Sequence, residues 1–331
     1  DYDKALIINP KEVRVYNNRG SAYLAKNQTS QSIIDFTMAI KINAKYATAY
    51  YNRGRAYLKK NKTDRAILDF NKTLELKQNF AAAYLERGLI YSSRTQYDQA
   101  ISDYGKALMI NPKYSKAYNN RGSAFLKKGQ FDQSIADFTK ALEIDQKFSA
   151  AYSNRGNAYF KKGQTNQALK DYNKALKINP TFAMAYNNRG NVYLKNKQFD
   201  RAIMDFSKAI KINPQLANAY YNRGISYASK DQYDNAIRDY TYALKLNPKS
   251  IEAYYNRGVS YHRNGEYKNA IRDYTKVIEI NPKAVLTYEN RGFTYLIKLG
   301  EKVKGCADWK KACELGKCRN YNLAKRKNYC L

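Results

Sequence analysis

The sequence has little of several residue types on which enzymes and membrane proteins depend. Its 331 residues include one histidine, one tryptophan and four cysteines, and no cysteine occurs before residue 306. No run of about 18 apolar residues occurs, so we expect no membrane span. The histidine, His262, has no cysteine or recurring carboxylate expected near it, and the glycines form no phosphate-cradling loop. We therefore expect no catalytic site, no metal, no cofactor and no enzymatic activity.

Positive charge, by contrast, is abundant. The 59 lysines and arginines outnumber the 28 acidic residues and give a formal net charge of +31. A charge of this size attracts acidic polypeptides, nucleic acid or anionic surfaces. The lysines are spread along the whole sequence, and a composition rich in Asn, Lys, Ile and Tyr is also what an AT-rich genome produces. Both interpretations of the charge stay open.

A short motif recurs along nearly the whole chain. The triplet Asn-Arg-Gly occurs in steps of 34 residues or twice 34, and the single gap is filled by Glu86-Arg87-Gly88. A fixed period of 20 to 50 residues is the signature of stacked structural units, each burying its apolar face against its neighbours. We number the positions of each unit from 1 to 34, with residue 13 as position 1 of the first unit. The triplets begin at Asn18, Asn52, Asn120, Asn154, Asn188, Asn222, Asn256 and Asn290.

The spacing within each unit predicts two helices. Tyr at position 4, Gly at position 8 and Tyr or Phe at position 11 fall on one face of a first helix. The recurring glycine suggests that another backbone passes too close for a side chain. A second helix carries Ala or Ser at position 20, an aromatic residue at position 24 and usually Ala at position 27. All six prolines lie at position 32, where they end one hairpin and open the next.

This pattern resembles the tetratricopeptide repeat. The resemblance implies an all-α, right-handed superhelical α-solenoid of helix-turn-helix repeats, with first helices lining a concave groove and second helices on the convex back. We predict three segments: a second-helix remnant of a truncated repeat at 1–12, nine tandem units at 13–318 with an irregular ninth, and a basic capping segment at 319–331. Because the sequence begins within a repeat, we expect either an upstream segment or a partner molecule to complete the first repeat.

Arginine at position 7 recurs together with aspartate at position 23. An arginine row alone would suggest an anion-binding surface. Because both signs recur equally, we favour a partly buried Arg–Asp pair within each hairpin, which the planar guanidinium suits.

The resemblance places ligand contacts on positions 2, 5, 6, 9, 12 and 13 of the first helices. The asparagine row at position 6 is similar to the asparagine ladder in the repeat domain of O-linked N-acetylglucosamine transferase, and a carboxamide per repeat suits an extended peptide backbone. Alternatively, these asparagines hold neighbouring first helices together. Position 5 varies, as specificity determinants do, and position 13 adds cations at the groove edge. The remaining candidate groove residues are Tyr51, Tyr221 and Tyr255 at position 5, Asn157 and Asn191 at position 9, and Lys127, Lys161 and Lys195 at position 13.

The ninth unit departs from the period and contains all four cysteines. Trp309 takes the place of the position-24 aromatic residue, and the segment resembles a terminal cap. Four cysteines allow three pairings. We favour Cys306 with Cys330 and Cys313 with Cys318, because the first pair would fasten a final helix onto the ninth unit. A zinc site is the less favoured alternative, since the spacing lacks Cys-x-x-Cys. Disulfides would indicate an extracytoplasmic location.

We therefore predict a non-catalytic scaffold that binds an extended, acidic polypeptide in the groove. The alternatives are a structural protein that assembles head to tail into filaments, through the open first half-repeat, and a protein that binds nucleic acid or an anionic surface.

Overall fold

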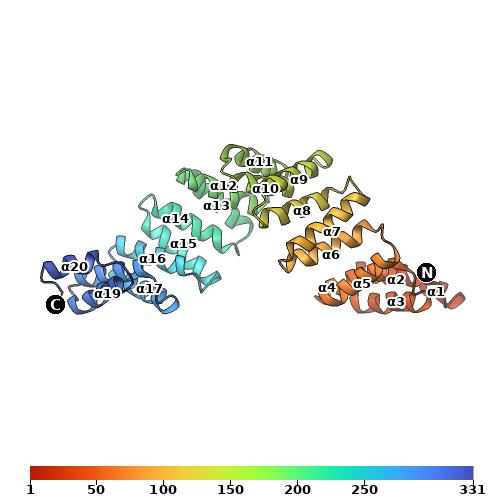
Figure 1. Ribbon diagram of the computed structural model, residues 1–331, viewed down its shortest axis with the longest axis horizontal. Helices are drawn as coiled ribbons and strands as arrows, with labels where there is room; N and C mark the ends of the chain where they lie inside the picture. The colour runs from red at the N-terminus through yellow and green to blue at the C-terminus, as the bar shows by residue number, and fades with distance from the viewer. Residues whose placement is uncertain (331) are drawn as a thin grey trace. The chain divides into compact units, whose positions relative to one another are not determined.

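The computed structural model describes residues 1–330, and within that range the secondary structure is entirely helical. The predicted all-α solenoid of helical repeats is confirmed. The contacts divide the chain into two compact units, and the boundary in the sequence falls between Asp171 and Tyr172, within helix α11 (Thr165–Ile178). We describe each unit separately, and Figure 1 shows the order of the helices.

Unit 1 is a stack of helical hairpins. The short helix α1 (Tyr2–Ile8) packs against the first hairpin. The first helices of the hairpins are α2 (Val13–Ala25), α4 (Ala47–Lys59), α6 (Ala81–Ser93), α8 (Ser115–Lys127) and α10 (Ser149–Lys161). The second helices are α3 (Thr29–Ile42), α5 (Thr63–Leu76), α7 (Tyr97–Ile110) and α9 (Phe131–Ile144).

Unit 2 repeats this arrangement and then becomes irregular. Its first helices are α12 (Ala183–Lys195), α14 (Ala217–Ala228), α16 (Ile251–Arg263) and α18 (Val285–Phe293), and its second helices are α13 (Phe199–Ile212), α15 (Tyr233–Leu246) and α17 (Tyr267–Ile280). A π-helical turn, η1 (Thr294–Lys298), follows α18, and α19 (Lys302–Glu314) and α20 (Arg319–Arg326) complete the chain.

The core of each hairpin that lies within one unit is a glycine on the first helix facing an aromatic ring on the second. A Cβ atom added to Gly54 would lie 2.7 Å from Cε1 of Phe70, and one added to Gly224 would lie 2.8 Å from Cε1 of Tyr240. The prediction that a neighbouring backbone excludes a side chain at position 8 was therefore wrong, because the nearest atoms belong to the ring of position 24. These rings are completely buried, or almost so.

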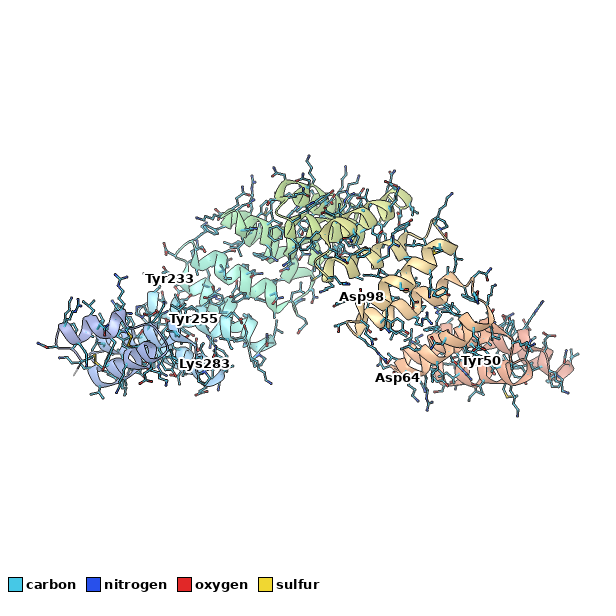
Figure 2. All side chains as sticks on the ribbon, in the orientation of Figure 1. Tyr50, Asp64, Asp98, Tyr233, Tyr255 and Lys283 are labelled. Atoms are coloured by element: carbon cyan, nitrogen blue, oxygen red, sulfur yellow. A yellow bond between two sulfur atoms is a disulfide. The ribbon has the colours of Figure 1, made fainter. Side chains whose placement is uncertain are left out.

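A bidentate Arg–Asp pair also closes each hairpin, as predicted. Arg53 donates from Nε and Nη2 to the two carboxylate oxygens of Asp69, at 2.9 and 2.8 Å. Its guanidinium lies between the rings of Tyr50 and Tyr57 (Tyr50 is labelled in Figure 2), 5.6 and 5.9 Å from their centroids. The third nitrogen, Nη1, donates to Thr37 on the preceding second helix at 3.2 Å. Because the position-7 arginines are committed to these contacts, the alternative of an anion-binding row loses its support.

The Arg–Asp pair of the ninth unit does not follow the 34-residue period, because that unit has one additional residue between its arginine and its aspartate. Arg291 binds Asp308 through two hydrogen bonds of 2.8 Å, at a sequence separation of 17 where the other pairs have 16. At the other end of the chain, Asp3 of α1 accepts from Nη1 of Arg19 at 2.5 Å. Asp3 thus occupies the place that Thr37 holds in the next hairpin.

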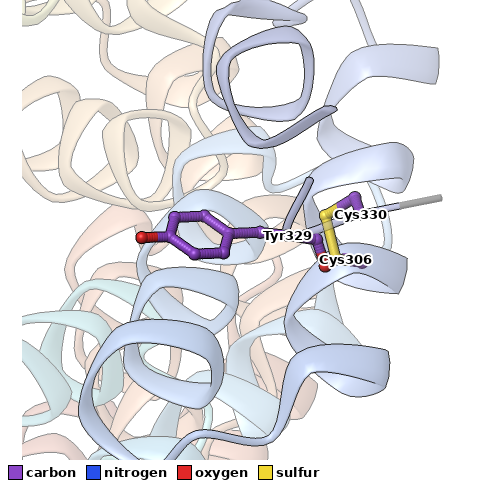
Figure 3. The surroundings of a disulfide bond; sticks show 3 residues. All are labelled: Cys306, Tyr329 and Cys330. Atoms are coloured by element: carbon purple, nitrogen blue, oxygen red, sulfur yellow. Dashed lines mark hydrogen bonds between the residues drawn. A yellow bond between two sulfur atoms is a disulfide. The ribbon is translucent and has the colours of Figure 1, made fainter. Parts of the chain in front are cut away.

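The end of unit 2 is closed by a disulfide-linked cap. Cys306 of α19 is bonded to Cys330, and Cys313 is bonded to Cys318, which are the two pairings that the sequence favoured. Figure 3 shows Cys330 lying against α19 at the first of these bonds. Leu296, Trp309, Ala324 and Cys330 form a buried cluster, so α20 covers the apolar side of the ninth unit. Trp309 fills the place of the usual ring, with its Cδ1 2.7 Å from where a Cβ on Gly292 would lie.

Candidate functional site

The candidate site is the side of each unit formed by the first helices, which we call the first-helix face. The position-6 asparagines lie on it, half-buried except for the exposed Asn18. Asn52 donates from Nδ2 to Oδ1 of Asn17 at 2.9 Å, and Asn154 donates to Asn119 in the same way at 3.0 Å. Each of these bonds joins neighbouring first helices. This geometry favours the alternative in which the asparagine row holds first helices together.

In unit 2 the same donor finds different acceptors. Asn256 and Asn290 donate to the hydroxyl oxygens of Tyr221 and Tyr255, both at 2.9 Å. Asn222 instead reaches Oδ1 of Asn191, at position 9, at 2.8 Å. The carboxamide oxygens of Asn120, in unit 1, and of Asn188, in unit 2, accept weak contacts from the preceding residue of the same helix, at 3.3 and 3.4 Å. One amide hydrogen of each donating asparagine is thus used within the stack, and a second remains for a ligand.

Position 5 is mostly an interior position. Asn17, Leu85, Asn119, Ser153 and Asn187 are at most 9% exposed. The sequence suggested that position 5 varies as specificity determinants do; in those repeats the side chain is buried, and Asn17 and Asn119 accept hydrogen bonds from the next first helix. Sequence variation alone cannot separate this arrangement from surface exposure, since an acceptor for the next repeat's amide can be Asn or Tyr.

The three tyrosines at position 5 are only partly buried. Tyr51 packs against Phe70 and Phe80, with ring centroids 5.9 and 4.8 Å away. Tyr221 and Tyr255 lie against the core rings Tyr240 and Tyr274 at 5.8 and 6.2 Å. These aromatic contacts fix the orientation of each ring, so its hydroxyl reaches the first-helix face.

Glu86 interrupts the asparagine row in unit 1. It is half-buried and follows Tyr51 by 35 positions, the separation that joins Asn256 to Tyr221. Burial raises the pKa of Glu86, although the charges of Arg55 and Lys116 act in the opposite direction. Burial, together with the nearby Glu86 charge, raises the pKa of Tyr51 to about 12. Position 6 of α6 therefore carries a carboxylate in an environment that suits an amide.

The cations at position 13 lie at the carboxyl ends of the first helices. Lys127, Lys161 and Lys195 are the last residues of α8, α10 and α12 and are exposed. Lys59 donates to the carbonyl oxygen of Leu24, in the last turn of the preceding first helix α2. Asn157 is half-buried at position 9, as is Asn191. The predicted edge residues are thus accessible on the first-helix face.

A row of inter-repeat contacts to aspartate, most of them ion pairs, was missed in the sequence. Arg94 binds Asp64 at 2.7 Å, and Asn264 donates to Asp234 at 2.9 Å. Three lysines form the corresponding pairs, Lys128 with Asp98, Lys162 with Asp132, and Lys230 with Asp200. Asp64 and Asp98 are labelled in Figure 2. Cations recurring at position 14 with aspartates at position 18 were the signal that could have revealed this row.

The first-helix face of unit 2 is hollowed by three adjoining pockets. A pocket of about 390 Å³ lies between α16 and α18 and is lined by Tyr221, Ile251, Glu252, Tyr255, Asn256, Val285 and Leu286, among others. A second pocket, of about 260 Å³, shares Tyr221 and Glu252 with the first and extends to α14. A third, of about 430 Å³, shares Tyr255 and Asn256 and extends to His262, Arg263 and Phe293. Volumes of this order hold one or a few side chains.

His262 takes part in the structure rather than in a catalytic arrangement. Its Nδ1 lies 2.9 Å from Oγ1 of Thr294, and that hydroxyl donates to the carbonyl oxygen of Asn290 at 2.7 Å. The hydroxyl hydrogen is used, so Nδ1 of His262 is the donor in this contact. Burial, followed by the charges of Lys298 and Arg263, lowers the pKa of His262. The imidazole is therefore uncharged at neutral pH, and it lines the third pocket.

Metal-binding clusters and membrane-spanning helices concern the whole described range. Within residues 1–330, no three or more His, Cys, Asp and Glu residues gather where they could hold a metal ion. None of the helices in this range has both the length and the apolar character needed to cross a bilayer.

The chain is similar in sequence to families of helical repeats. A family described as "TPR repeat" matches residues 20–61, 90–129, 122–163, 156–197 and 226–265, which is more than half of the chain. Two families described as "Tetratricopeptide repeat" match residues 47–80, 183–216 and 251–284, and residues 206–238. No curated protein matches the sequence.

Several solved structures are similar to this chain. YrrB, described as a TPR protein with an unusual peptide-binding site, is 26% identical, with a TM-score of 0.53 over 57% of this chain and 97% of its own. A tetratricopeptide repeat protein from Parabacteroides merdae is 24% identical, with a TM-score of 0.52 over 73% of this chain and 95% of its own. The APC/C hetero-tetramer Cut9-Hcn1 matches at 17% identity, with a TM-score of 0.63 over 88% of this chain and 58% of the matched chain. The last two similarities concern the fold alone.

Proposed function

Because the chain belongs to the tetratricopeptide repeat family, whose members typically serve as protein–protein interaction scaffolds, we propose that it is a non-catalytic scaffold that binds an extended polypeptide on its first-helix face. The observation that carries this proposal is the run of three adjoining pockets over α14, α16 and α18. The pockets open where half-buried asparagines and tyrosines keep unused hydrogen-bonding capacity. The peptide-binding site of YrrB, a similar structure, supports the same class of function.

The charge of the first-helix face favours an acidic partner. The recurring aspartates at positions 18 and 23 are largely occupied by ion pairs within the stack. Lys127 and Lys161 are exposed at the ends of α8 and α10, and neither forms an ion pair with a described residue. Unpaired cations at the rim of a site mainly raise the association rate and select partners of opposite charge.

Charge reversal on the two faces of unit 1 tests this proposal. The variant Lys127→Glu with Lys161→Glu changes the first-helix face, and the matched variant Lys106→Glu with Lys140→Glu changes two exposed lysines on second helices. Partners that co-purify with the full chain should be lost from the first variant and retained by the second. Equal retention by both variants would contradict binding on the first-helix face of unit 1.

The same preparations distinguish the alternative functions. Binding to nucleic acid would respond equally to both variants and would fall steeply as salt is raised, since phosphate contacts release counterions. Head-to-tail assembly would appear in light scattering as a mass that grows with protein concentration in both variants. We also propose an extracytoplasmic location, because two disulfides in one cap are typical of oxidising compartments.

A further inference from the structure

Two matched Tyr–Asn pairs lie side by side on the first-helix face of unit 2. Asn256 donates to the hydroxyl oxygen of Tyr221, and Asn290 donates to that of Tyr255, both at 2.9 Å. The two hydroxyl oxygens act as acceptors in these bonds, so both O–H groups remain available to donate. Within the described residues, Oδ1 of Asn256 and of Asn290 accepts no hydrogen bond. Each pair thus presents one donor beside one acceptor, the complement of a peptide group.

An apolar cavity separates the two pairs. The pocket of about 390 Å³ is walled by the two tyrosine rings and by Ile251, Val285 and Leu286, and Leu286 is 53% exposed. An exposed aliphatic side chain at the mouth of a concave apolar site gains most from covering by another apolar group. The pocket is therefore shaped for one bulky apolar side chain.

The two ends of the run of pockets along α16 differ in charge. Glu252, in the first turn of α16, lines the pocket at one end. Arg263, the last residue of α16, lines the adjoining third pocket with His262 and Phe293, and the charges of Arg263 and Lys298 both act on His262. No described residue forms an ion pair or hydrogen bond with Arg263. The distance from one end to the other is about 16 Å for eleven residues of helix, which an extended peptide of about five residues spans.

From these observations, and resting on the proposed function, we infer the ligand class of unit 2. The ligand is an extended peptide with one bulky apolar side chain in the pocket between α16 and α18 and a carboxylate, two or three residues away, against Arg263. The Tyr–Asn pairs bind its backbone, so the apolar and acidic side chains carry the sequence preference.

An array of seven-residue peptides, acetylated and amidated, tests the ligand class with the full oxidised chain as the probe. We expect enrichment of peptides with Leu, Phe or Trp and an Asp or Glu two or three positions away. A second set, with a free carboxyl terminus and no acidic side chain, distinguishes a terminal carboxylate from a side-chain carboxylate as the group that Arg263 binds. No enrichment in either set, or enrichment without a bulky apolar residue, overturns the inference.

Matched variants locate the binding site of the best peptide by fluorescence anisotropy. Leu286→Glu should weaken binding about tenfold or more, as expected for a central apolar contact. Met204→Glu, at a second-helix position that is 51% exposed, should change it less than twofold. Arg263→Ala should weaken binding about threefold and reduce its salt dependence, as a rim charge does, while Arg238→Ala on α15 should not.

The outcomes also separate this inference from the proposed function. If Asn256→Ala weakens peptide binding but Leu286→Glu does not, the apolar-anchor inference fails and binding on the first-helix face stands. If Asn256→Ala, Leu286→Glu and the double variant Lys127→Glu with Lys161→Glu all leave binding to every ligand unchanged, the inference and the proposed function both fail. Circular dichroism of Leu286→Glu should match that of Met204→Glu, because both residues are exposed.

Discussion

The substitution Glu86→Asn should repair the one interruption of the asparagine row. Tyr51 precedes Glu86 by the same 35 residues that separate Tyr221 from Asn256 and Tyr255 from Asn290, and each of those pairs forms a hydrogen bond of 2.9 Å. An asparagine at position 86 would find the Tyr51 hydroxyl in the corresponding place. A neutral hydrogen bond contributes about 1 kcal/mol net. Removing a half-buried carboxylate adds to that gain at neutral pH.

The pH dependence of this gain has a definite sign. Burial raises the pKa of Glu86 in the folded state above its value in the unfolded chain. The folded state therefore holds its proton more tightly, and the wild-type free energy of unfolding falls as the pH rises from the unfolded pKa through the folded pKa. Above that window the cost of the charged carboxylate is constant. The advantage of Glu86→Asn should thus be largest near pH 7 and should shrink to the hydrogen-bond contribution below about pH 4.

Urea denaturation at pH 7 and pH 4 measures both effects. Glu86→Gln is the control, because it removes the charge while its longer side chain does not reproduce the asparagine geometry. A double-mutant cycle with Tyr51→Phe should give a coupling of about 1 kcal/mol for the Asn variant. The reasoning is refuted if Asn and Gln variants are equally stable and the cycle shows no coupling.

Three further predictions concern stability. Gly224→Ala should destabilise the chain by about 1–3 kcal/mol by overpacking against Tyr240. Gly105→Ala, whose nearest neighbour is Arg121 Nη1 at 3.8 Å, should instead stabilise it by up to about 1 kcal/mol. Thermal denaturation of both variants checks this contrast. Thr95→Gly should raise stability by about 1 kcal/mol, because Thr95 has a φ of 61°, a conformation that favours glycine. The next two hairpins have Gly129 and Gly163 at the corresponding position. An unchanged melting temperature would contradict this prediction. Cys306→Ser with Cys330→Ser should lower the free energy of unfolding by about 3 kcal/mol, because the lost bond spans 24 residues. Cys313→Ser with Cys318→Ser should lower it by about 2 kcal/mol, because that bond spans 5 residues. Hydrogen exchange in α20 should increase more in the first variant, and equal protection in both would contradict the role of Cys306–Cys330 in holding α20 in place.

The hairpin interior could be predicted from sequence because its chemistry recurs within one unit. Arg53 and Asp69 lie 16 residues apart in the same hairpin, and a charge pair repeated at that separation indicates contact. The cap pairing followed from the need to fasten α20 to the ninth unit. The neighbour of Gly54 was misassigned, since an invariant glycine shows only that space is lacking. Whether a backbone or the Phe70 ring fills that space depends on how the ring is oriented.

Contacts between repeats were harder to predict. The bond from Asn52 to Asn17 and the pair of Lys128 with Asp98 join residues of different repeats, so each looks like a free surface residue within its own repeat. The pockets of unit 2 were beyond sequence reasoning for a related reason. Their volume depends on how far side chains of α16 and α18 fill the space between two helices.

Variation at position 5 changes the surface of the first-helix face without breaking the contact between repeats. Asn17 and Asn119 are buried as acceptors for the next asparagine, so the space between those first helices is filled. Tyr221 and Tyr255 accept the same amide through a hydroxyl at the end of a longer, ring-bearing side chain, and their rings become pocket walls. The inter-repeat hydrogen bond therefore occurs with both kinds of acceptor, and in unit 2 the tyrosine acceptors also form part of the wall of a pocket. We therefore expect the shape of the first-helix face in unit 2 to depend on which acceptor each repeat offers to its neighbour's asparagine.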